Sequence, residues 1–358
     1  MVNIMHRKIT LFIDTFGTGG AERVCVTYAN ILFGLGFEVS IMVFNQSMKS
    51  YLDELDAGIK IVNLNSKNGI FAFLTLLARP RLIKDTDVFI AFNHQISLIL
   101  YILTRLCCIK TTIIARNVNN LKLDLNAKKG NILKRHITKF LMHYFYNKMD
   151  RYIAQCNAMK HSMSDLYSIE LDKIEVIYNP IAPKFKKIEQ KKDVDILFVG
   201  RLTQQKGIDN LVEILNKLKR TISSFNVHIV GLGELQSLLL NELDKYGIKY
   251  TYECKCNDMV ALYNKARVTI LTSYYEGYPN VLVESIACGT PVVSFDCESG
   301  PSEIIDNEIN GFLIPRFDID VFTSKLAYVL RSDFQINAEL VNNDYKDKLI
   351  NVINSSCR

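Results

Sequence analysis

Short runs of β-branched and apolar residues alternate along the chain with longer stretches whose apolar residues recur at helical spacing. In the first half the runs are KITLFID, EVSIMVF, IKIVNL, DVFIAF, TTIIA, RYIAQ and KIEVIYN. In the second half they are DILFVG, NVHIVG, KYTYE, RVTILT and PVVSF. Strands that alternate with helices predict parallel sheets covered by helices on both faces.

The two series are separated by NPIAPKFKKIEQKKDVD, residues 179–195, which has two prolines, five lysines and no apolar periodicity. We interpret this segment as an interdomain linker. A chain of 358 residues also exceeds what one hydrophobic core usually supports. The sequence therefore predicts an α/β protein with two doubly wound, Rossmann-like domains, residues 1–182 and 183–358. The polar tail from about residue 337 either returns to the first domain as a helix or frays.

Ligands of doubly wound sheets bind beyond the carboxyl ends of the strands. With two such domains facing each other, we expect the active site in the central cleft between them.

Composition narrows the class of protein. The nine cysteines are odd in number and lack the paired spacing of a zinc site or a disulfide framework, so we expect reduced, cytosolic thiols. The N-terminus has no small-residue cleavage site of a signal peptide. The longest apolar stretches, GIFAFLTLLA and ISLILYIL, have 10 and 8 residues, whereas a bilayer crossing needs about 20. We expect a protein that is soluble or lies on a surface.

Positive charge is concentrated in the first half. Residues 1–184 hold 23 Lys and Arg against 14 Asp and Glu, whereas the rest holds 20 against 23. Residues 128–152 alternate basic and apolar groups at helical spacing, which suits contact with anionic lipid headgroups. A solvated helix that packs its apolar stripe on its own sheet would show the same pattern. No nucleic-acid-binding signature accompanies the basic stretch, so we expect no nucleic-acid partner.

Two loops at predicted strand ends could hold an anion. DTFGTGGAER, residues 14–23, contains Gly19 and Gly20 at a strand-to-helix turn, where backbone N–H groups are exposed. A plain connecting turn would look the same, because neither the dinucleotide fingerprint nor a P-loop is present. FVGRLTQQKG, residues 198–207, places Arg201 and Lys206 where a diphosphate would be held, unless both are simply surface cations.

The stretch EGYPNVLVE, residues 276–284, carries two carboxylates. Pro279 predicts the start of a helix, which leaves Glu276 in the loop and Glu284 about one turn into the helix. Between them lies a helix N-terminus with unpaired N–H groups at the positive end of the dipole. A sugar nucleotide has the matching order of groups: sugar hydroxyls, a diphosphate and ribose hydroxyls. Carboxylates accept from hydroxyls, while N–H groups and cations meet the phosphates.

GGAER, GRLTQQKG and EGYPNVLVE, followed by SIACGTPVVSFDCESGPSEII, occur in this order over about residues 8–331. The sequence resembles the retaining glycosyltransferases of family 4, which have the GT-B fold. The resemblance implies that Arg201 and Lys206 hold the diphosphate and stabilise the leaving group. It also implies that Glu276 contacts the donor sugar and that Glu284 binds the nucleotide ribose.

The resemblance implies further donor contacts. The loop with Gly19 and Gly20 would close over the donor phosphates and border the acceptor site. Backbone groups of Pro279, Asn280 and Val281 would lie at the donor sugar and phosphate.

The chain departs from the family pattern after the fifth strand of the first domain. Several relatives have a histidine or an acid there, whereas this chain has Ala115, Arg116 and Asn117. Arg116 is a candidate for the acceptor side, on a phosphate or an acidic acceptor. His94, after the fourth strand, is a second candidate, although a structural histidine is the commoner reading of such a position.

The sequence is thus expected to encode an enzyme that moves a hexose or N-acetylhexosamine from a UDP-sugar, with retention, to a glycan or lipid-linked glycan of a surface polysaccharide such as O-antigen, capsule or lipopolysaccharide. We expect no cofactor and no metal, and a cytoplasmic location, peripheral on the inner face of the membrane. A sugar-nucleotide epimerase of the same fold and a non-catalytic sugar-nucleotide-binding module are the alternatives. A glycogen-type phosphorylase is disfavoured by the short chain and by the lack of a pyridoxal lysine environment.

Overall fold

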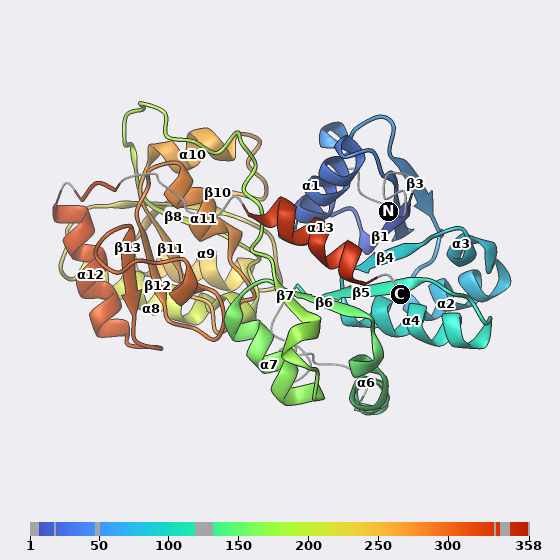
Figure 1. Ribbon diagram of the computed structural model, residues 1–358. Coiled ribbons are helices and arrows are strands. Elements are labelled where there is room, and N and C mark those ends of the chain that lie inside the picture. The colour runs from blue at the N-terminus through green and yellow to red at the C-terminus, as the bar shows by residue number, and fades with distance from the viewer. Residues whose placement is uncertain are drawn as a thin grey trace. The chain divides into compact units, whose positions relative to one another are not determined.

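The structure of the chain is a computed structural model (Figure 1). It describes residues 7–17, 19–46, 51–118, 132–332, 334–336 and 344–356; the side chains of residues 132–135 also lie outside the description. The chain divides into unit 1, residues 1–180 and 342–358, and unit 2, residues 181–341.

Unit 1 is built on a seven-stranded parallel sheet with the order β3-β2-β1-β4-β5-β6-β7. Its strands are β1 (Lys8–Thr15), β2 (Glu38–Asn45), β3 (Lys60–Asn63), β4 (Val88–Ala91), β5 (Thr112–Arg116), β6 (Arg151–Ala154) and β7 (Ile174–Val176). The strand order reverses direction between β1 and β4, which is the switch point of a doubly wound sheet.

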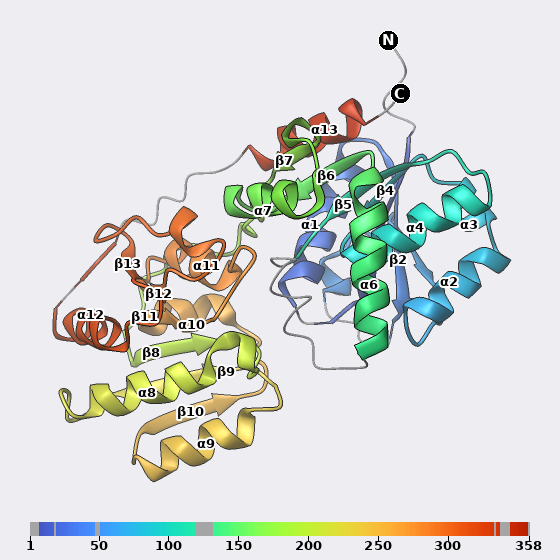
Figure 2. The ribbon, with the colours of Figure 1, turned by 90° about the horizontal axis from the view of Figure 1, so that it is seen from below.

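Helices cover both faces of this sheet. They are α1 (Gly20–Gly34), α2 (Gly69–Ala78), α3 (Arg81–Lys84), α4 (His94–Leu106), α6 (Ile132–Phe145), α7 (Asn157–Tyr167) and α13 (Tyr345–Ser355), with short 3-10 turns η2 (Leu52–Glu54), η3 (Tyr146–Lys148) and η4 (Leu171–Lys173). In Figures 1 and 2, α1 and α13 lie on one face, and α2, α4 and α6 lie on the other.

The C-terminal helix α13 packs into unit 1. Leu349, Val352 and Ile353 are almost fully buried in the same core as the residues of α1 and β1. Arg151 Nη2 donates to the Ser355 carbonyl oxygen at 3.0 Å. Apolar residues at this helical spacing bury one face of the helix, so the tail returns to the first unit as a helix.

Unit 2 is a six-stranded parallel sheet with the order β10-β9-β8-β11-β12-β13. Its strands are β8 (Val194–Val199), β9 (Asn226–Val230), β10 (Lys249–Glu253), β11 (Ala266–Leu271), β12 (Val292–Phe295) and β13 (Gly311–Ile314). Its helices are α8 (Ile208–Lys219), α9 (Gln236–Lys245), α10 (Met259–Lys265), α11 (Asn280–Ala287) and α12 (Ile319–Arg331), with 3-10 turns η5 (Gln204–Lys206) and η6 (Pro301–Glu303).

The predicted fold class, two doubly wound parallel sheets, is confirmed. The sequence pattern missed one strand, β13. Its four residues, GFLI, begin with glycine and are too few to show a periodicity. Pairing with β12 in parallel register, rather than local propensity, places these residues in the sheet.

The lysine-rich segment that the sequence suggested as a linker packs onto unit 2. Phe185 is buried in a core with Tyr263, and the backbone N–H of Ile188 donates to Asn264 Oδ1 at 2.7 Å. Lys192 Nζ donates to the Ala266 carbonyl oxygen at 2.7 Å and to Thr290 Oγ1 at 2.8 Å. Burial lowers the pKa of Lys192 to about 8. Single anchoring residues leave no periodic pattern, so the sequence could not reveal this packing.

In the ranges that the structure describes, no helix combines the length and apolar character needed to cross a bilayer.

Gly207 lies between η5 and α8 with φ +62°, and a Cβ there would overlap the carbonyl oxygen of Thr272. Gly247 has the same φ, but a Cβ there would meet only the flexible end of Lys219, at 3.6 Å. We expect Gly247→Ala to lower the free energy of unfolding by about 1 kcal/mol through backbone strain alone. Gly207→Ala should cost roughly 2 kcal/mol more, because the loop must shift.

Urea unfolding of the full chain that carries each substitution measures the difference. Equal losses in the free energy of unfolding would mean that the loop at Gly207 shifts without cost.

Candidate functional site

Two loops of unit 2 meet at the carboxyl edge of its sheet. Residues 200–207 follow β8, and residues 272–279 follow β11. The strands β8 and β11 are hydrogen-bonded neighbours in parallel register, so their carboxyl ends lie side by side. Sequence segments about 70 residues apart are thereby brought into contact.

Backbone and side-chain hydrogen bonds fix the two loops to each other. Thr272 Oγ1 donates to the Lys206 carbonyl oxygen at 2.9 Å, and the Tyr274 N–H donates to the Gln205 carbonyl oxygen at 2.9 Å. Asn210 Nδ2 donates to the Thr272 carbonyl oxygen at 3.2 Å. These hydrogen bonds therefore hold the backbone of Lys206 in place independently of its side chain.

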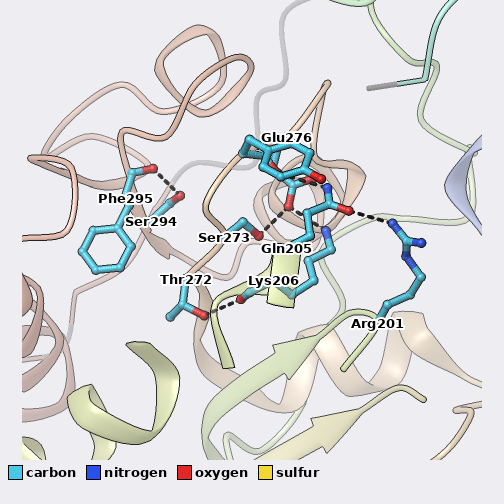
Figure 3. Close-up of polar contacts among 9 residues, drawn as sticks. Arg201, Gln205, Lys206, Thr272, Ser273, Glu276, Ser294 and Phe295 are labelled. Atoms are coloured by element: carbon cyan, nitrogen blue, oxygen red, sulfur yellow. Dashed lines mark hydrogen bonds and ion pairs between the residues drawn. The ribbon is translucent and has the colours of Figure 1, made fainter. Parts of the chain in front are cut away.

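The centre of the site is an ion pair between Lys206 and Glu276. Lys206 Nζ lies 2.6 Å from Glu276 Oε1, and Ser273 Oγ donates to the same oxygen at 2.5 Å (Figure 3). The Lys206 and Glu276 side chains are only 13% and 7% exposed. Removing one partner of a buried pair leaves an uncompensated charge and costs about 3–5 kcal/mol. The structure thus holds a cation and a carboxylate in one fixed geometry.

Arg201 comes from the same loop but lies at the surface. Its Nη2 donates to Gln205 Oε1 at 2.8 Å, and Gln205 Nε2 donates to the Tyr275 carbonyl oxygen at 3.1 Å (Figure 3). One loop therefore carries two cations: Lys206 as a buried point charge and Arg201 as an exposed planar fork. Such a pair can contact an anion from two directions.

The helix α11 begins directly after Glu276 and its neighbours. Pro279 is the N-cap with extended backbone (φ −73°, ψ 100°) and supplies no side-chain cap. Asn280 and Val281 begin the first turn, at the end of the helix where backbone N–H groups point outward. This N-terminus brings positive partial charge to the end of the loop that carries Glu276.

Glu284 lies in α11 and is 7% exposed. Its Oε2 accepts a hydrogen bond from Tyr263 Oη at 3.0 Å. The structure therefore places Glu276 in the loop before the helix and Glu284 within it, as the position of Pro279 predicted.

The turn after β12 supports the loop that carries Glu276. The Glu276 N–H donates to the Glu298 carbonyl oxygen at 3.2 Å. Gly300 has φ +93°, and a Cβ there would lie 2.6 Å from Pro279 Cδ and 2.7 Å from the Gly277 carbonyl oxygen. Burial, and to a smaller extent the Glu276 carboxylate, raises the pKa of the nearby Cys297 thiol. Cys297 therefore lies beside the site as a neutral thiol.

The candidates of unit 1 follow neighbouring strands of its sheet: Gly19 and Gly20 follow β1, His94 follows β4, and Arg116 ends β5. Gly19 is the N-cap of α1, and the carboxylate of Glu22 lies against it. A carboxylate of the chain itself therefore occupies the space beside Gly19 at the N-terminus of α1. His94 is the first residue of α4 and is 5% exposed.

Arg116, the acceptor-side candidate at the carboxyl end of β5, is fully buried. Its Nη2 donates to Asn179 Oδ1 at 2.7 Å, and its guanidinium lies 4.8 Å from the ring centroid of Phe92 and 5.7 Å from that of Tyr28. No described residue accepts from its Nε or Nη1 in hydrogen-bond geometry. Burial is the main cause that lowers the pKa of Arg116; the neighbouring Tyr28 and Cys25 oppose it.

Sequence reasoning missed three side chains of unit 2: Gln205, Ser273 and Tyr263. Gln205 lies inside the motif FVGRLTQQKG, and Ser273 lies three residues before EGYPNVLVE, so their proximity to Lys206 and Glu276 in the sequence was the available signal. Tyr263 lies in α10 and reaches Glu284 only through the packing of α10 on α11. No sequence signal pointed to it.

Pairs of aspartates separated by one residue, a frequent metal-binding pattern, occur at 85/87, 193/195 and 318/320. Asp87 accepts from the Lys8 N–H, Asp195 from the Asn226 N–H, and Asp318 caps α12 through the Val321 N–H. One carboxylate of each pair therefore has a structural role in the fold.

Comparisons with known proteins agree with this architecture. A family model described as Glycosyl transferases group 1 matches residues 181–347, and one described as Glycosyltransferase Family 4 matches residues 18–185. The chain is 28% identical over 357 residues to the Campylobacter jejuni GalNAc-alpha-(1->4)-GalNAc-alpha-(1->3)-diNAcBac-PP-undecaprenol alpha-1,4-N-acetyl-D-galactosaminyltransferase, covering 94% of this chain and 92% of that protein.

Two solved structures have the same fold. The apo form of the lipopolysaccharide outer core galactosyltransferase WaaB aligns with a TM-score of 0.72 at 22% identity, covering 98% of this chain and 100% of that one. Anabaena HepE in complex with UDP-glucose aligns with a TM-score of 0.73 at 16% identity, with the same coverage.

Two doubly wound parallel sheets in one chain, a fold shared with these solved glycosyltransferases, define the GT-B class of enzymes. The chain belongs to the family 4 glycosyltransferases, and it is a glycosyltransferase.

Proposed function

We propose that the enzyme moves a hexose or N-acetylhexosamine from a UDP-sugar to a glycan or lipid-linked glycan acceptor in surface-polysaccharide biosynthesis, with retention at the anomeric carbon. The observation that carries the proposal is the preformed pair of Lys206 and Glu276 beside the N-terminus of α11. It provides a cation for a phosphate and a carboxylate for a sugar hydroxyl at one place.

The roles that we propose for the side chains follow from their charge and their burial. Lys206 and Arg201 contact the donor diphosphate, together with the amides of Asn280 and Val281. As the bond between sugar and β-phosphate breaks, negative charge grows on the phosphate, and a preorganised cation stabilises that charge. Glu276 holds Lys206 in position while the donor is absent.

The two carboxylates act at opposite ends of the donor. Glu276 accepts a hydrogen bond from a donor-sugar hydroxyl, and Glu284 accepts from the ribose hydroxyls. Tyr263 keeps the Glu284 carboxylate oriented through its hydrogen bond to Oε2. Acceptor orientation and leaving-group stabilisation supply the catalysis, and no protein carboxylate acts as nucleophile.

Names of the relatives support the substrate classes. The Campylobacter protein is named for transfer of N-acetylgalactosamine to an undecaprenol-diphosphate-linked glycan, and HepE was solved with UDP-glucose. Gly19 and Gly20 would border the donor phosphates, and His94 and Arg116 would act on the acceptor side. Because Arg116 is fully buried, it would act there by holding its neighbours in position.

We further propose that the reaction needs no metal, because two cations and a helix N-terminus already meet the diphosphate. The enzyme would work at the cytoplasmic face of the membrane, where a lipid-linked acceptor and UDP-sugars are both accessible. Residues 128–152 would contact the anionic lipid surface; of these, 128–131 lie outside the described residues.

The test of the function is a screen of UDP- and GDP-sugars in EDTA, read by thermal unfolding and then by turnover. A UDP-sugar at about 100 times its Kd should add about 2.7 kcal/mol to the free energy of unfolding. Sugar transfer to an undecaprenol-diphosphate glycan should follow, with chelator present. Loss of transfer in EDTA with recovery in manganese contradicts metal independence, release of an epimerised sugar indicates an epimerase, and binding without turnover indicates a binding module.

Glu284→Gln and Glu276→Gln separate the two carboxylates. Loss of the Glu284 charge should weaken the affinity for UDP about tenfold to a hundredfold, since hydrogen bonds to a charged group contribute about 1.5–3 kcal/mol. Glu276→Gln should leave UDP affinity within about threefold and lower the turnover of the sugar donor, because UDP lacks the sugar. Calorimetric titration of both variants with UDP measures this; equal losses would contradict the assignment.

Lys206→Ala should lower kcat by about a hundredfold or more, which corresponds to about 2.7 kcal/mol of transition-state stabilisation, while the donor KM changes less. The exposed Lys245→Ala serves as the control for loss of a lysine in the same unit. The change removes the cation that pairs with Glu276 and could destabilise the fold. Circular dichroism therefore checks that the variant is folded. Near-normal kcat with only a raised KM would mean uniform binding of substrate and transition state, and would defeat this role.

A further inference from the structure

Three helices of unit 1 form one continuous outer layer. In Figures 1 and 2, α2, α4 and α6 lie over the same face of the sheet, with α4 in contact with both of the others. The rings of Tyr101 on α4 and Phe145 on α6 lie 5.9 Å apart and join these two helices. We call the outward side of these helices the α2–α6 surface.

The helix α2 presents an apolar face outward as well as inward. Ala72 and Leu76 are fully buried, yet Phe71, Leu74 and Leu77 on the opposite face are 53%, 51% and 40% exposed. The sequence of α2, GIFAFLTLLA, contains no charged residue. A contiguous apolar face of this kind is unfavourable in water and marks an interaction surface.

The helix α6 adds a second apolar stripe with cations beside it. Ile137, Phe140 and Tyr144 recur at helical spacing and are 51%, 58% and 53% exposed. The Phe140 and Tyr144 rings lie 4.5 Å apart, and Lys139, which precedes Phe140 in the chain, is also exposed. Exposed aromatic rings on a helix that also carries an exposed cation are typical of helices that lie in a membrane interface.

The charged residues within these three helices are all basic. The sequences of α2, α4 and α6 contain no Asp or Glu. Arg105 and Lys139 lie within these helices, and Arg79, Lys110 and Lys148 lie just beyond their C-terminal ends; all five are exposed. Such a surface is complementary to an anionic partner.

We propose that the α2–α6 surface lies on an anionic lipid bilayer, with the apolar side chains of α2 and α6 among the lipids and the cations at the phosphates. A second copy of the chain fits less well, because the same face would present cations to cations and these helices have no acid to pair with them. The inference rests on the proposed action at a membrane and adds α2, which no basic motif marks, as a principal contact.

The experiment is sedimentation of the full chain with phosphatidylcholine vesicles, with and without about one-third phosphatidylglycerol. Wild type should bind the anionic vesicles, and less strongly at high salt. Leu74→Ser/Leu77→Ser should weaken this binding roughly tenfold or more. The control is Leu171→Ser/Leu238→Ser, which removes two leucines that are 44% and 50% exposed outside this surface, and it should bind as wild type does.

Two further measurements keep the outcomes distinct. Both double variants should bind UDP with wild-type affinity, so failure of UDP binding in wild type refutes the proposed function without touching the vesicle result. Equal binding of the two double variants, or no wild-type binding to anionic vesicles, overturns the membrane surface. A dimer in sedimentation velocity that Leu74→Ser/Leu77→Ser abolishes, without vesicle binding, assigns the surface to a second copy instead.

Discussion

The close packing of Gly207 against the carbonyl oxygen of Thr272 is the constraint on which the site of unit 2 depends. It lets the loop after β8 approach the loop after β11 until Thr272 Oγ1 bonds the Lys206 carbonyl. At this separation of the two backbones, Lys206 Nζ lies 2.6 Å from Glu276 Oε1. The ion pair is a consequence of that backbone contact, because a side chain at residue 207 would push the two loops apart.

The fold handles three cations in three ways. Lys206 is neutralised by Glu276, whereas Lys192 has only oxygen acceptors without charge, and burial lowers its pKa to about 8. Arg116 lies against two aromatic rings and one amide oxygen. Burying a charge without a counter-ion is costly. Of the three, only Lys206 has a carboxylate as its partner, so only its ammonium group is held in direction by an ion pair.

Much of the fold was predictable from the sequence because strands of parallel sheets are buried on both faces and read as continuous apolar runs. β13 was not, since four residues that begin with glycine carry too little pattern. The segment 179–195 was interpreted as a linker, because anchoring by Phe185 and Lys192 depends on partners far along the chain. Long-range partners are invisible to periodicity.

The sequence by itself determined the two-sheet class, the strand ends at which Arg201, Lys206 and Glu276 occur, and the helix start at Pro279, because these follow from local periodicity and proline geometry. Only the tertiary structure decided which side chains touch. It paired Lys206 with Glu276, oriented Glu284 with Tyr263 and enclosed Arg116. Those outcomes depend on which strands are neighbours in the sheet, and strand order is set by packing across the whole unit rather than by any local stretch of chain.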